Sequence, residues 1–204
     1  DACTWHGVTC TSGNITGIDL SGNNLTGSIP AELQDLLQLN TLNLANNQLT
    51  GSIPTEIGNM STLTSLSLGN NAVYTSDSSL DTFITALDAD WKDTQTIAPA
   101  NLQASQLISD AGEVVTDSFV LSWSAIPYTG DGGYYEVRYG TTEGGPYDQA
   151  GCTTADKTAT SCTISGLTGA SSGTGYYFVI RTLTAAPWVT GNELWSDDSA
   201  EVTN

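Results

Sequence analysis

Basic residues are scarce in this sequence: 4 Lys and Arg stand against 22 Asp and Glu, for a formal net charge of −18. A protein that binds nucleic acid needs clustered Lys and Arg to displace counterions from the phosphates, and docking on anionic lipid needs a similar cluster. Four scattered cations provide neither. The chain also lacks an apolar run of about 18 residues, the length that a membrane-spanning helix requires. We therefore expect a protein partner, with copies of the same chain among the candidates.

Histidine is nearly absent, which argues against the commonest kinds of catalysis. The single histidine, His6, lies between Cys3 and Cys10 beside Trp5, where a structural role is the simpler interpretation. A Ser-His pair has no other histidine to use. The sequence shows neither a Gly-rich phosphate-binding loop nor a dinucleotide fingerprint. We predict a protein that is not an enzyme and that carries no cofactor.

Acidic residues gather at a few places, as they do in calcium-binding loops. The clusters are Asp77 with Asp81, Asp88 with Asp90 and Asp93, and Asp197 with Asp198. The spacing and the glycine of the EF-hand loop are missing from all of them. Solvated surface acids are the simpler interpretation, and Ca²⁺ binding stays open as an alternative.

The four cysteines form two close pairs, Cys3 with Cys10 and Cys152 with Cys162. No CxxC motif accompanies them, so a zinc site is disfavoured and one disulfide in each half of the chain is predicted. Disulfides persist in oxidising compartments. The sequence begins at Asp1 without a methionine or an apolar leader, as a secreted chain does after signal cleavage. We expect a secreted protein, located outside the cell or at the cell surface.

The first half of the chain consists of internal repeats. Leu20, Leu44 and Leu68 recur at a spacing of 24, and so do Asn23, Asn47 and Asn71. Each repeat predicts a short strand with inward leucines, an asparagine that turns inward to hydrogen-bond the backbone of neighbouring coils, and an irregular or helical return. After the third repeat, helical spacing of apolar residues predicts a helix that covers the end of the core; these residues are Leu80, Phe83, Ile84 and Leu87, followed by Trp91.

These repeats resemble the plant-type leucine-rich repeat, LxxLxLxxNxLxGxIPxxLxxLxx. The opening CTWHGVTC at residues 3–10 resembles the N-terminal cap of that family, CxWxGVxC. The resemblance implies an α/β solenoid, right-handed, with a parallel sheet on its concave side, in a domain at residues 1–96. Receptors of the family generally carry many more repeats than the two full and one divergent repeats found here.

Beyond Thr94–Pro99, interpreted as a linker, short alternating segments are separated by Gly, Ser and Thr. Strands are predicted at Phe119–Trp123, Tyr134–Tyr139, Ser161–Ser165, Tyr176–Leu183 and Ser199–Val202. About seven strands in ~100 residues favour an antiparallel sandwich. The order of the segments, with CTISGLTG before GYYFVIRT, resembles the fibronectin type III domain. That resemblance implies an all-β, immunoglobulin-like sandwich at residues 97–204.

Two surfaces are candidates for contact with a partner. The concave face of the repeats presents small residues with one acid in four columns, which are Gly17, Thr41 and Ser65; Asp19, Asn43 and Ser67; Ser21, Ala45 and Gly69; and Gly22, Asn46 and Asn70. Binding hot spots favour Trp, Tyr and Arg, so tight peptide binding is not expected on a face about 15 Å wide. The second surface is a predicted sandwich loop, where Pro187, Trp188 and Val189 form an apolar run and are the predicted partner contact. The alternative is that Trp188 folds back onto its own domain.

Three sequons are candidate sites of N-glycosylation: Asn14-Ile-Thr, Asn24-Leu-Thr and Asn59-Met-Ser. Such triplets accept glycans in a eukaryotic secretory pathway. They also arise by chance in a repeat rich in Asn and Thr, and both interpretations are left open.

The sequence favours a non-enzymatic extracellular structural or adhesive protein, a subunit that self-assembles into a filament or surface layer through a head-to-tail contact. An alternative is a ligand-binding module for peptide or glycan, as the resemblance to plant-type repeat receptors implies. A third is an accessory fragment of a larger secreted enzyme. A saturable soluble ligand would favour the second function, and a longer parent gene with a catalytic domain the third.

Overall fold

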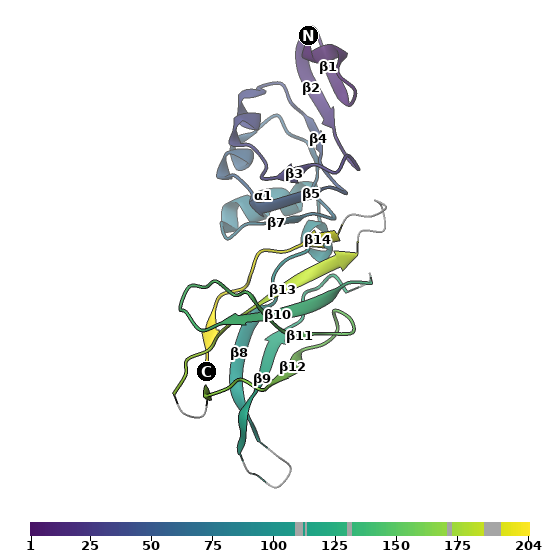
Figure 1. The fold of residues 1–204 in the computed structure, drawn as a ribbon. Helices are drawn as coiled ribbons and strands as arrows, with labels where there is room; N and C mark the ends of the chain where they lie inside the picture. The colour runs from purple at the N-terminus through teal and green to yellow at the C-terminus, as the bar shows by residue number, and fades with distance from the viewer. Residues whose placement is uncertain (109–111, 113, 130–131, 171–172, 186–192) are drawn as a thin grey trace. The chain divides into compact units, whose positions relative to one another are not determined.

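The computed structural model describes residues 1–108, 112, 114–129, 132–170, 173–185 and 193–204 (Figure 1). The chain divides into two compact units. The first comprises Asp1–Thr96, and the second comprises Ile97–Ala185 and Trp195–Asn204. Each unit has a hydrophobic core of its own.

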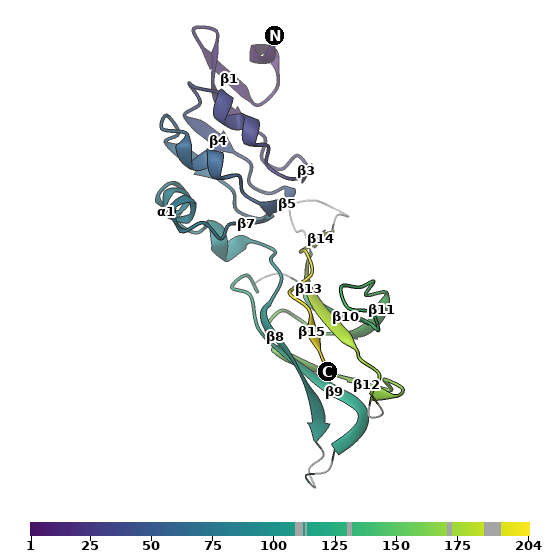
Figure 2. The ribbon, with the colours of Figure 1, turned by 90° about the vertical axis from the view of Figure 1, so that its left-hand side faces the viewer.

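Short parallel strands recur through the first unit, as the repeated pattern predicts (Figure 2). β2 (Asn14–Asp19), β4 (Thr41–Asn43) and β6 (Ser65–Ser67) form one parallel ladder. β3 (Thr26–Gly27), β5 (Gln48–Ser52) and β7 (Ala72–Tyr74) form a second. The 3₁₀ helices η2 (Ala31–Asp35) and η3 (Thr55–Asn59) return the chain between coils. Leucines and isoleucines from all coils share one core, including Leu39, Leu42, Ile53, Ile57, Leu66 and Leu68.

The first sheet differs from the expected three-stranded parallel sheet. After the 3₁₀ helix η1 (Ala2–Thr4), β1 (Val8–Thr11) pairs antiparallel with β2, so the sheet is mixed and has the order β1-β2-β4-β6. The two-residue turn Ser12-Gly13, with φ of 51° and 81°, closes this hairpin, and Gly7, with φ of 82°, lies against Asp19. A Cβ at Gly7 would lie 2.1 Å from the carbonyl oxygen of Asp19. The Cys3–Cys10 disulfide, with Cα atoms 5.6 Å apart, links η1 to β1.

Buried asparagine amides join successive coils of the first unit. Asn47 is 1% exposed, and its Oδ1 accepts hydrogen bonds from the backbone N–H groups of Asn23 and Leu25, each at 3.0 Å. Its Nδ2 donates to the carbonyl oxygens of Leu20 and Leu44, each at 2.9 Å. The expected inward asparagine is therefore present, and Asn71 repeats the arrangement one coil later. Asn23 is the exception, since it is exposed.

Gln95 continues this series one repeat length after Asn71. Its Oε1 accepts from the N–H of Val73 at 3.1 Å, and its Nε2 donates to the carbonyl oxygens of Leu68 and Trp91 at 3.0 and 2.8 Å. Both Gln95 and Thr96 are 1% exposed. The start of the segment Thr94–Pro99 is therefore part of the repeat core, which corrects its interpretation as a linker.

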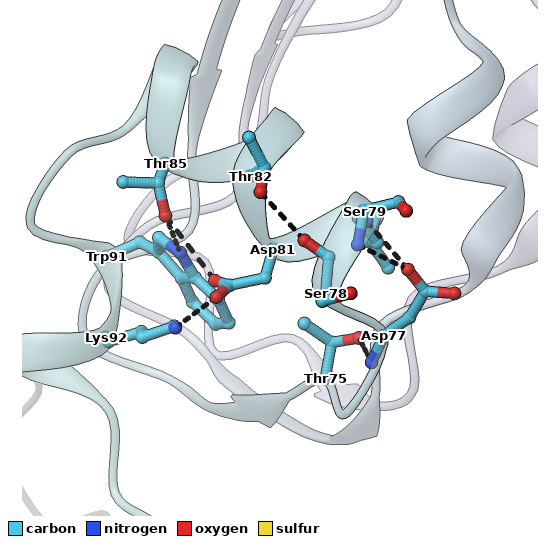
Figure 3. A network of polar contacts seen from close by, with 10 residues as sticks. Thr75, Asp77, Ser78, Ser79, Asp81, Thr82, Thr85, Trp91 and Lys92 are labelled. Carbon is cyan, nitrogen blue, oxygen red and sulfur yellow. Dashed lines mark hydrogen bonds and ion pairs between the residues drawn. The ribbon is translucent and has the colours of Figure 1, made fainter.

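The predicted capping helix is present as α1 (Ser78–Leu87), with Leu80 and Ile84 buried. The Asp77 side chain caps it by accepting from the N–H groups of Ser79 and Leu80. Figure 3 shows Lys92 paired with Asp81 on the outer side of the helix. The 3₁₀ helix η4 (Trp91–Thr94) follows and buries Trp91 against the same core.

Side chains take the place of a further coil at this end. The carboxylate of Asp88 accepts from the N–H of Leu68 at 2.8 Å, and Thr94 Oγ1 accepts from the N–H of Asn70 at 3.1 Å. In the preceding coil the corresponding donors, Leu44 and Asn46, bond to backbone carbonyls of the next coil. The cap therefore satisfies the open edge of the solenoid with local acceptors.

The second unit is built from two antiparallel sheets. One contains β12 (Ser161–Ser165), β9 (Val114–Ser124) and β8 (Ala100–Ile108), in that order. The other contains β11 (Gln149–Thr153), β10 (Tyr134–Gly140), β13 (Tyr177–Ala185) and β14 (Glu193–Trp195), with β15 (Val202–Thr203) also paired to β13. Side chains from both sheets form the core, among them Leu121, Tyr135, Phe178 and Ile180. The Cys152–Cys162 disulfide joins β11 of one sheet to β12 of the other.

The ladder predicts a large difference between two chemically identical substitutions. We expect Asn47→Ala to lower the free energy of unfolding of the first unit by about 3 kcal/mol or more, since it leaves several buried backbone groups without partners at ~1–3 kcal/mol each. Asn23→Ala is the matched control and should cost about 1 kcal/mol, because its exposed side chain donates one hydrogen bond, to Ser21. Urea unfolding, with amide hydrogen exchange at Leu25, measures both. Equal losses would contradict this account.

Candidate recognition surface

The outward side of the sheet β1-β2-β4-β6 carries small polar residues in register. Thr9 pairs with Gly17, Gly17 with Thr41, and Thr41 with Ser65. A second column contains Asp19, Asn43 and Ser67. The intervening residues Ile18, Leu42 and Leu66 are buried, because successive strand residues point to opposite faces. We call the outward set the hydroxyl face; its members are Thr9, Gly17, Asp19, Thr41, Asn43, Ser65 and Ser67.

The missing side chain of Gly17 leaves a small open cavity in the hydroxyl face. The cavity has a volume of about 180 Å³ and is lined by Thr9, Thr16, Gly17, Ile18, Asp19, Asn40 and Thr41. A Cβ at Gly17 would lie 3.3 Å from Cβ of Thr9 and 4.0 Å from Cβ of Thr41. The two threonines therefore wall the cavity on either side, and a side chain at position 17 would begin to fill it.

Asp19 supplies the carboxylate of the hydroxyl face. Its Oδ1 accepts from the Ser21 hydroxyl at 2.7 Å and from the Ser21 N–H at 3.1 Å. These two hydrogen bonds, helped by the Asn43 amide and opposed by slight burial, lower the pKa of Asp19 below its usual 3.8. The carboxylate is consequently ionised at neutral pH and oriented by Ser21.

The chemistry of the hydroxyl face is that of hydrogen bonding and of attraction to a cation. It offers hydroxyl groups, an amide and one carboxylate, which suit peptide backbone, sugar hydroxyls or a Lys or Arg side chain. Across the residues that the structure describes, no three His, Cys, Asp or Glu side chains lie together so as to hold a metal ion. In the same part of the chain, none of the helices combines the length and the apolar character of a membrane-crossing segment.

The structure places the other predicted site residues away from this face or does not describe them. Both predicted cysteine pairs are bonded, Cys3 to Cys10 and Cys152 to Cys162. The sequon asparagines are all exposed; they are Asn14, Asn24 and Asn59. The predicted contact at Pro187, Trp188 and Val189 lies outside the described residues and stays a prediction.

Sequence reasoning missed Thr9, which adds a fourth strand and a hydroxyl to the face. The alternation Val8-Thr9-Cys10-Thr11 was the available signal, since it has the period of a strand. This segment overlaps the cap motif at residues 3–10, where the two cysteines were the basis of the interpretation. The observed face is thus one strand wider than the three-stranded face expected from the repeats alone.

Comparisons with known proteins agree with the first unit. Residues 14–36 and 38–60 match the Leucine Rich Repeat family, so the first unit carries a leucine-rich-repeat domain. The match includes neither the opening CTWHGVTC nor any residue after 60. A comparison with curated protein sequences finds no match.

Similar solved structures come from plants. The BIR2 ectodomain from Arabidopsis thaliana is 37% identical with a TM-score of 0.34, and the alignment covers 35% of this chain and 39% of that chain. The HAESA receptor kinase ectodomain of Arabidopsis, in complex with an IDA peptide hormone, is 36% identical with a TM-score of 0.33, covering 35% and 12%. The Arabidopsis BIR3–SERK2 complex is 29% identical with a TM-score of 0.35, covering 42% and 46%. The chain therefore spans less than half the length of each of these chains.

The geometry around Asp19 predicts its titration. We expect Asp19 to titrate below 3.8, and Ser21→Ala to raise its pKa toward that ordinary value, because the two strongest contributions come from Ser21. The folded-state pKa is depressed, so this carboxylate stabilises the folded unit above pH 3.8, and that contribution is lost as the pH falls through the folded-state pKa. Carboxyl ¹³C chemical shifts followed against pH measure it. An Asp19 that titrates at its ordinary value in the unchanged protein would refute the assignment.

Proposed function

We propose that this chain is a non-enzymatic extracellular recognition module whose hydroxyl face binds an extended, basic segment of another protein. The observation that carries the proposal is the cavity at Gly17, where two threonine hydroxyls flank a polar recess beside the ionised Asp19. A Lys or Arg side chain placed there meets a carboxylate and hydroxyl acceptors. The adjoining hydroxyl and amide groups of β4 and β6 hydrogen-bond the backbone on either side.

The charge of the whole chain supports a basic partner. Of the four basic residues, three are engaged within the protein: Lys92 with Asp81, Arg181 with Glu136, and the buried Lys157 with Thr184. With 22 acidic residues in the sequence, the protein therefore carries a strongly negative net charge. A field of one sign speeds the approach of oppositely charged partners and disfavours like-charged ones.

The composition of the hydroxyl face supports modest affinity. Hot spots in tight interfaces are Trp, Tyr and Arg side chains, and the hydroxyl face has none of these. Four short strands at ~4.8 Å spacing give room for a few residues of an extended peptide. We therefore expect dissociation constants of about 10–100 μM for a short peptide, equivalent to roughly −5.5 to −7 kcal/mol.

The proposal follows the ligand-binding alternative from the sequence. One similar structure, HAESA, contains a bound peptide hormone. That likeness spans 35% of this chain, so the proposal rests on the chain's own surface. The third alternative, an accessory fragment of a secreted enzyme, stays a prediction.

Several finer assignments belong to the same proposal. The sheet orders β12-β9-β8 and β11-β10-β13-β14 support a fibronectin type III-like sandwich at residues 97–204. The β1–β2 hairpin with its disulfide supports the assignment of CTWHGVTC as an N-terminal cap. Two disulfides support secretion. In this scheme the chain needs neither a cofactor nor Ca²⁺, and the repeat domain does the binding.

The test is a titration with a defined probe. Residues 1–204, labelled with ¹⁵N, are titrated with a synthetic heptapeptide library that has a central Lys or Arg, and with a matched library that has a central Gln. We expect amide shifts at Thr9, Gly17 and Thr41 with the basic library, weakening as salt rises. Shifts spread over the surface, or none, would overturn the proposal.

A pair of variants distinguishes a specific carboxylate from general acidity. Asp19→Asn should weaken binding of the basic library about tenfold, close to 1.4 kcal/mol. Glu32→Gln removes the same charge from an exposed position on η2 and should change it less than twofold. Equal effects of the two variants would mean that only net charge matters.

Association into a closed pair of copies, a simpler form of self-assembly than the head-to-tail filament first favoured by the sequence, has one supporting observation. Within the described residues β8 lies at the edge of its sheet beside β9, and its nine residues include neither a charge nor a proline. Charges and prolines are the usual protection of an edge strand. Its regular register runs over Gln103–Gln106, between two irregularities. We propose it as the place where two copies with a charge of −18 each meet with least repulsion, β8 against β8.

Sedimentation velocity over a wide concentration range tests this second candidate. We expect a weak dimer that strengthens as salt screens the net repulsion. Gln103→Glu should weaken it, since it adds a negative charge to the pairing edge of both copies, while Gln149→Glu on β11 should leave it intact. A monomer at every concentration and salt would exclude self-assembly through β8.

A further inference from the structure

We infer that Asn14, Asn24 and Asn59 carry N-linked glycans, and that these glycans leave the hydroxyl face as the bare protein surface of the repeat domain. The inference about the bare face rests on the proposed function, whereas the modification itself does not. Each asparagine lies in the triplet that N-glycosylation requires, with Thr16, Thr26 and Ser61 as the hydroxyl residues.

The backbone turns all three asparagines outward. In each triplet the middle residue packs on the repeat core: Ile15 and Leu25 are partly buried against it, and Met60 is 5% exposed. The preceding asparagine therefore points away from the core. Asn14 begins β2, Asn24 has φ of 57° between β2 and β3, and Asn59 ends η3. All three are exposed.

The side-chain amides of these three asparagines also make no hydrogen bond on which the fold depends. Nδ2 of Asn14 makes a single long hydrogen bond, 3.4 Å to the carbonyl of Ser12. Among the described residues, the side chains of Asn24 and Asn59 have no hydrogen-bond partner. By contrast, Nδ2 of Asn47 and of Asn71 bonds buried carbonyls, and a glycan there would break the ladder. The sequons thus avoid every asparagine that joins the coils.

Asn24 and Asn59 lie outside the strands of the sheet β1-β2-β4-β6, whereas Asn14 lies at the start of β2, three residues before Gly17. Successive coils align by one repeat length, which places Asn14 beside Gln38, Asn24 beside Gln48, and Asn59 beside Asp35. None of these columns belongs to the hydroxyl face. A glycan is bulky and hydrophilic, so it blocks protein contact around its own attachment point. A protein partner is consequently directed to the hydroxyl face, on the side away from Asn14.

The chemistry requires a polyprenyl-diphosphate-linked oligosaccharide as donor, in the secretory compartment. The Asn Nδ2 attacks C1 of the first sugar, and the bond from C1 to the diphosphate oxygen breaks. The lipid diphosphate leaves with the electron pair, and the amide nitrogen loses one proton. The product is an N-glycosidic bond on a neutral amide, so the net charge of the chain does not change.

Peptide mapping of the natively secreted protein tests the modification. Peptide N-glycosidase digestion in H₂¹⁸O converts each glycosylated asparagine to ¹⁸O-labelled aspartate. We expect the label at positions 14, 24 and 59, and none at Asn40, which is exposed but has no hydroxyl residue two positions later. Unlabelled asparagine at all three sequons would overturn the inference. Thr16→Ala should remove the label from Asn14 alone.

An added glycan tests the bare face separately. Ala45→Thr creates the sequon Asn43-Leu-Thr on the hydroxyl face, and Ala45→Val adds a side chain of similar size without a sequon. Both are secreted from the same eukaryotic host. We expect the Ala45→Thr glycoform to lose at least tenfold in affinity for the basic heptapeptide library, and Ala45→Val to bind normally. If the native sequons carry glycans but the Ala45→Thr glycoform binds as well as the unchanged protein, the modification stands and the hydroxyl face is refuted as the binding site.

Discussion

The buried amide ladder is the constraint on which the first unit depends. Each coil of the solenoid must turn its backbone twice, and each turn leaves peptide groups in the core that no strand satisfies. Asn47 and Asn71 supply a donor and an acceptor to those groups from the coil that follows, and Gln95 does so at the last position. Since these bonds join one coil to the next, they also fix the register that aligns the outward columns of the sheet.

The hydroxyl face is a product of that register. Gly17, Thr41 and Ser65 lie side by side because each repeat of the sequence forms one coil, and the β1 hairpin adds Thr9 to the row. A different residue at one position therefore changes the shape of the whole row, as Gly17 does when it opens the cavity. The same stacking keeps the sequon asparagines out of the columns of the hydroxyl face. Packing, surface chemistry and modification thus follow from one spacing.

The sequence predicted most of the first unit, because a pattern that recurs in every coil shows which residues of successive coils lie side by side. Leu44, Asn47 and α1 needed no other information. The sequence did not predict that Gln95 continues the asparagine series, because a glutamine stands there in place of the asparagine found at the two preceding positions of the series. The antiparallel pairing of β1 was also missed, although the turn Ser12-Gly13, with both residues at positive φ, joins β1 directly to β2. In the second unit β11 was missed as a strand, because its sequence is polar and lacks the apolar alternation of β9 and β13.

The cap formed by Asp88, Thr94 and Gln95 has a consequence for how such a chain can change its length. These side chains close the last coil with bonds that no further coil can also make. Growth at this end would require the loss of the cap. A duplication of one whole repeat inside the array preserves every contact at both ends, because the new coil meets the same donors and acceptors as the old one. Evolution or a protein engineer can therefore lengthen this domain from its middle.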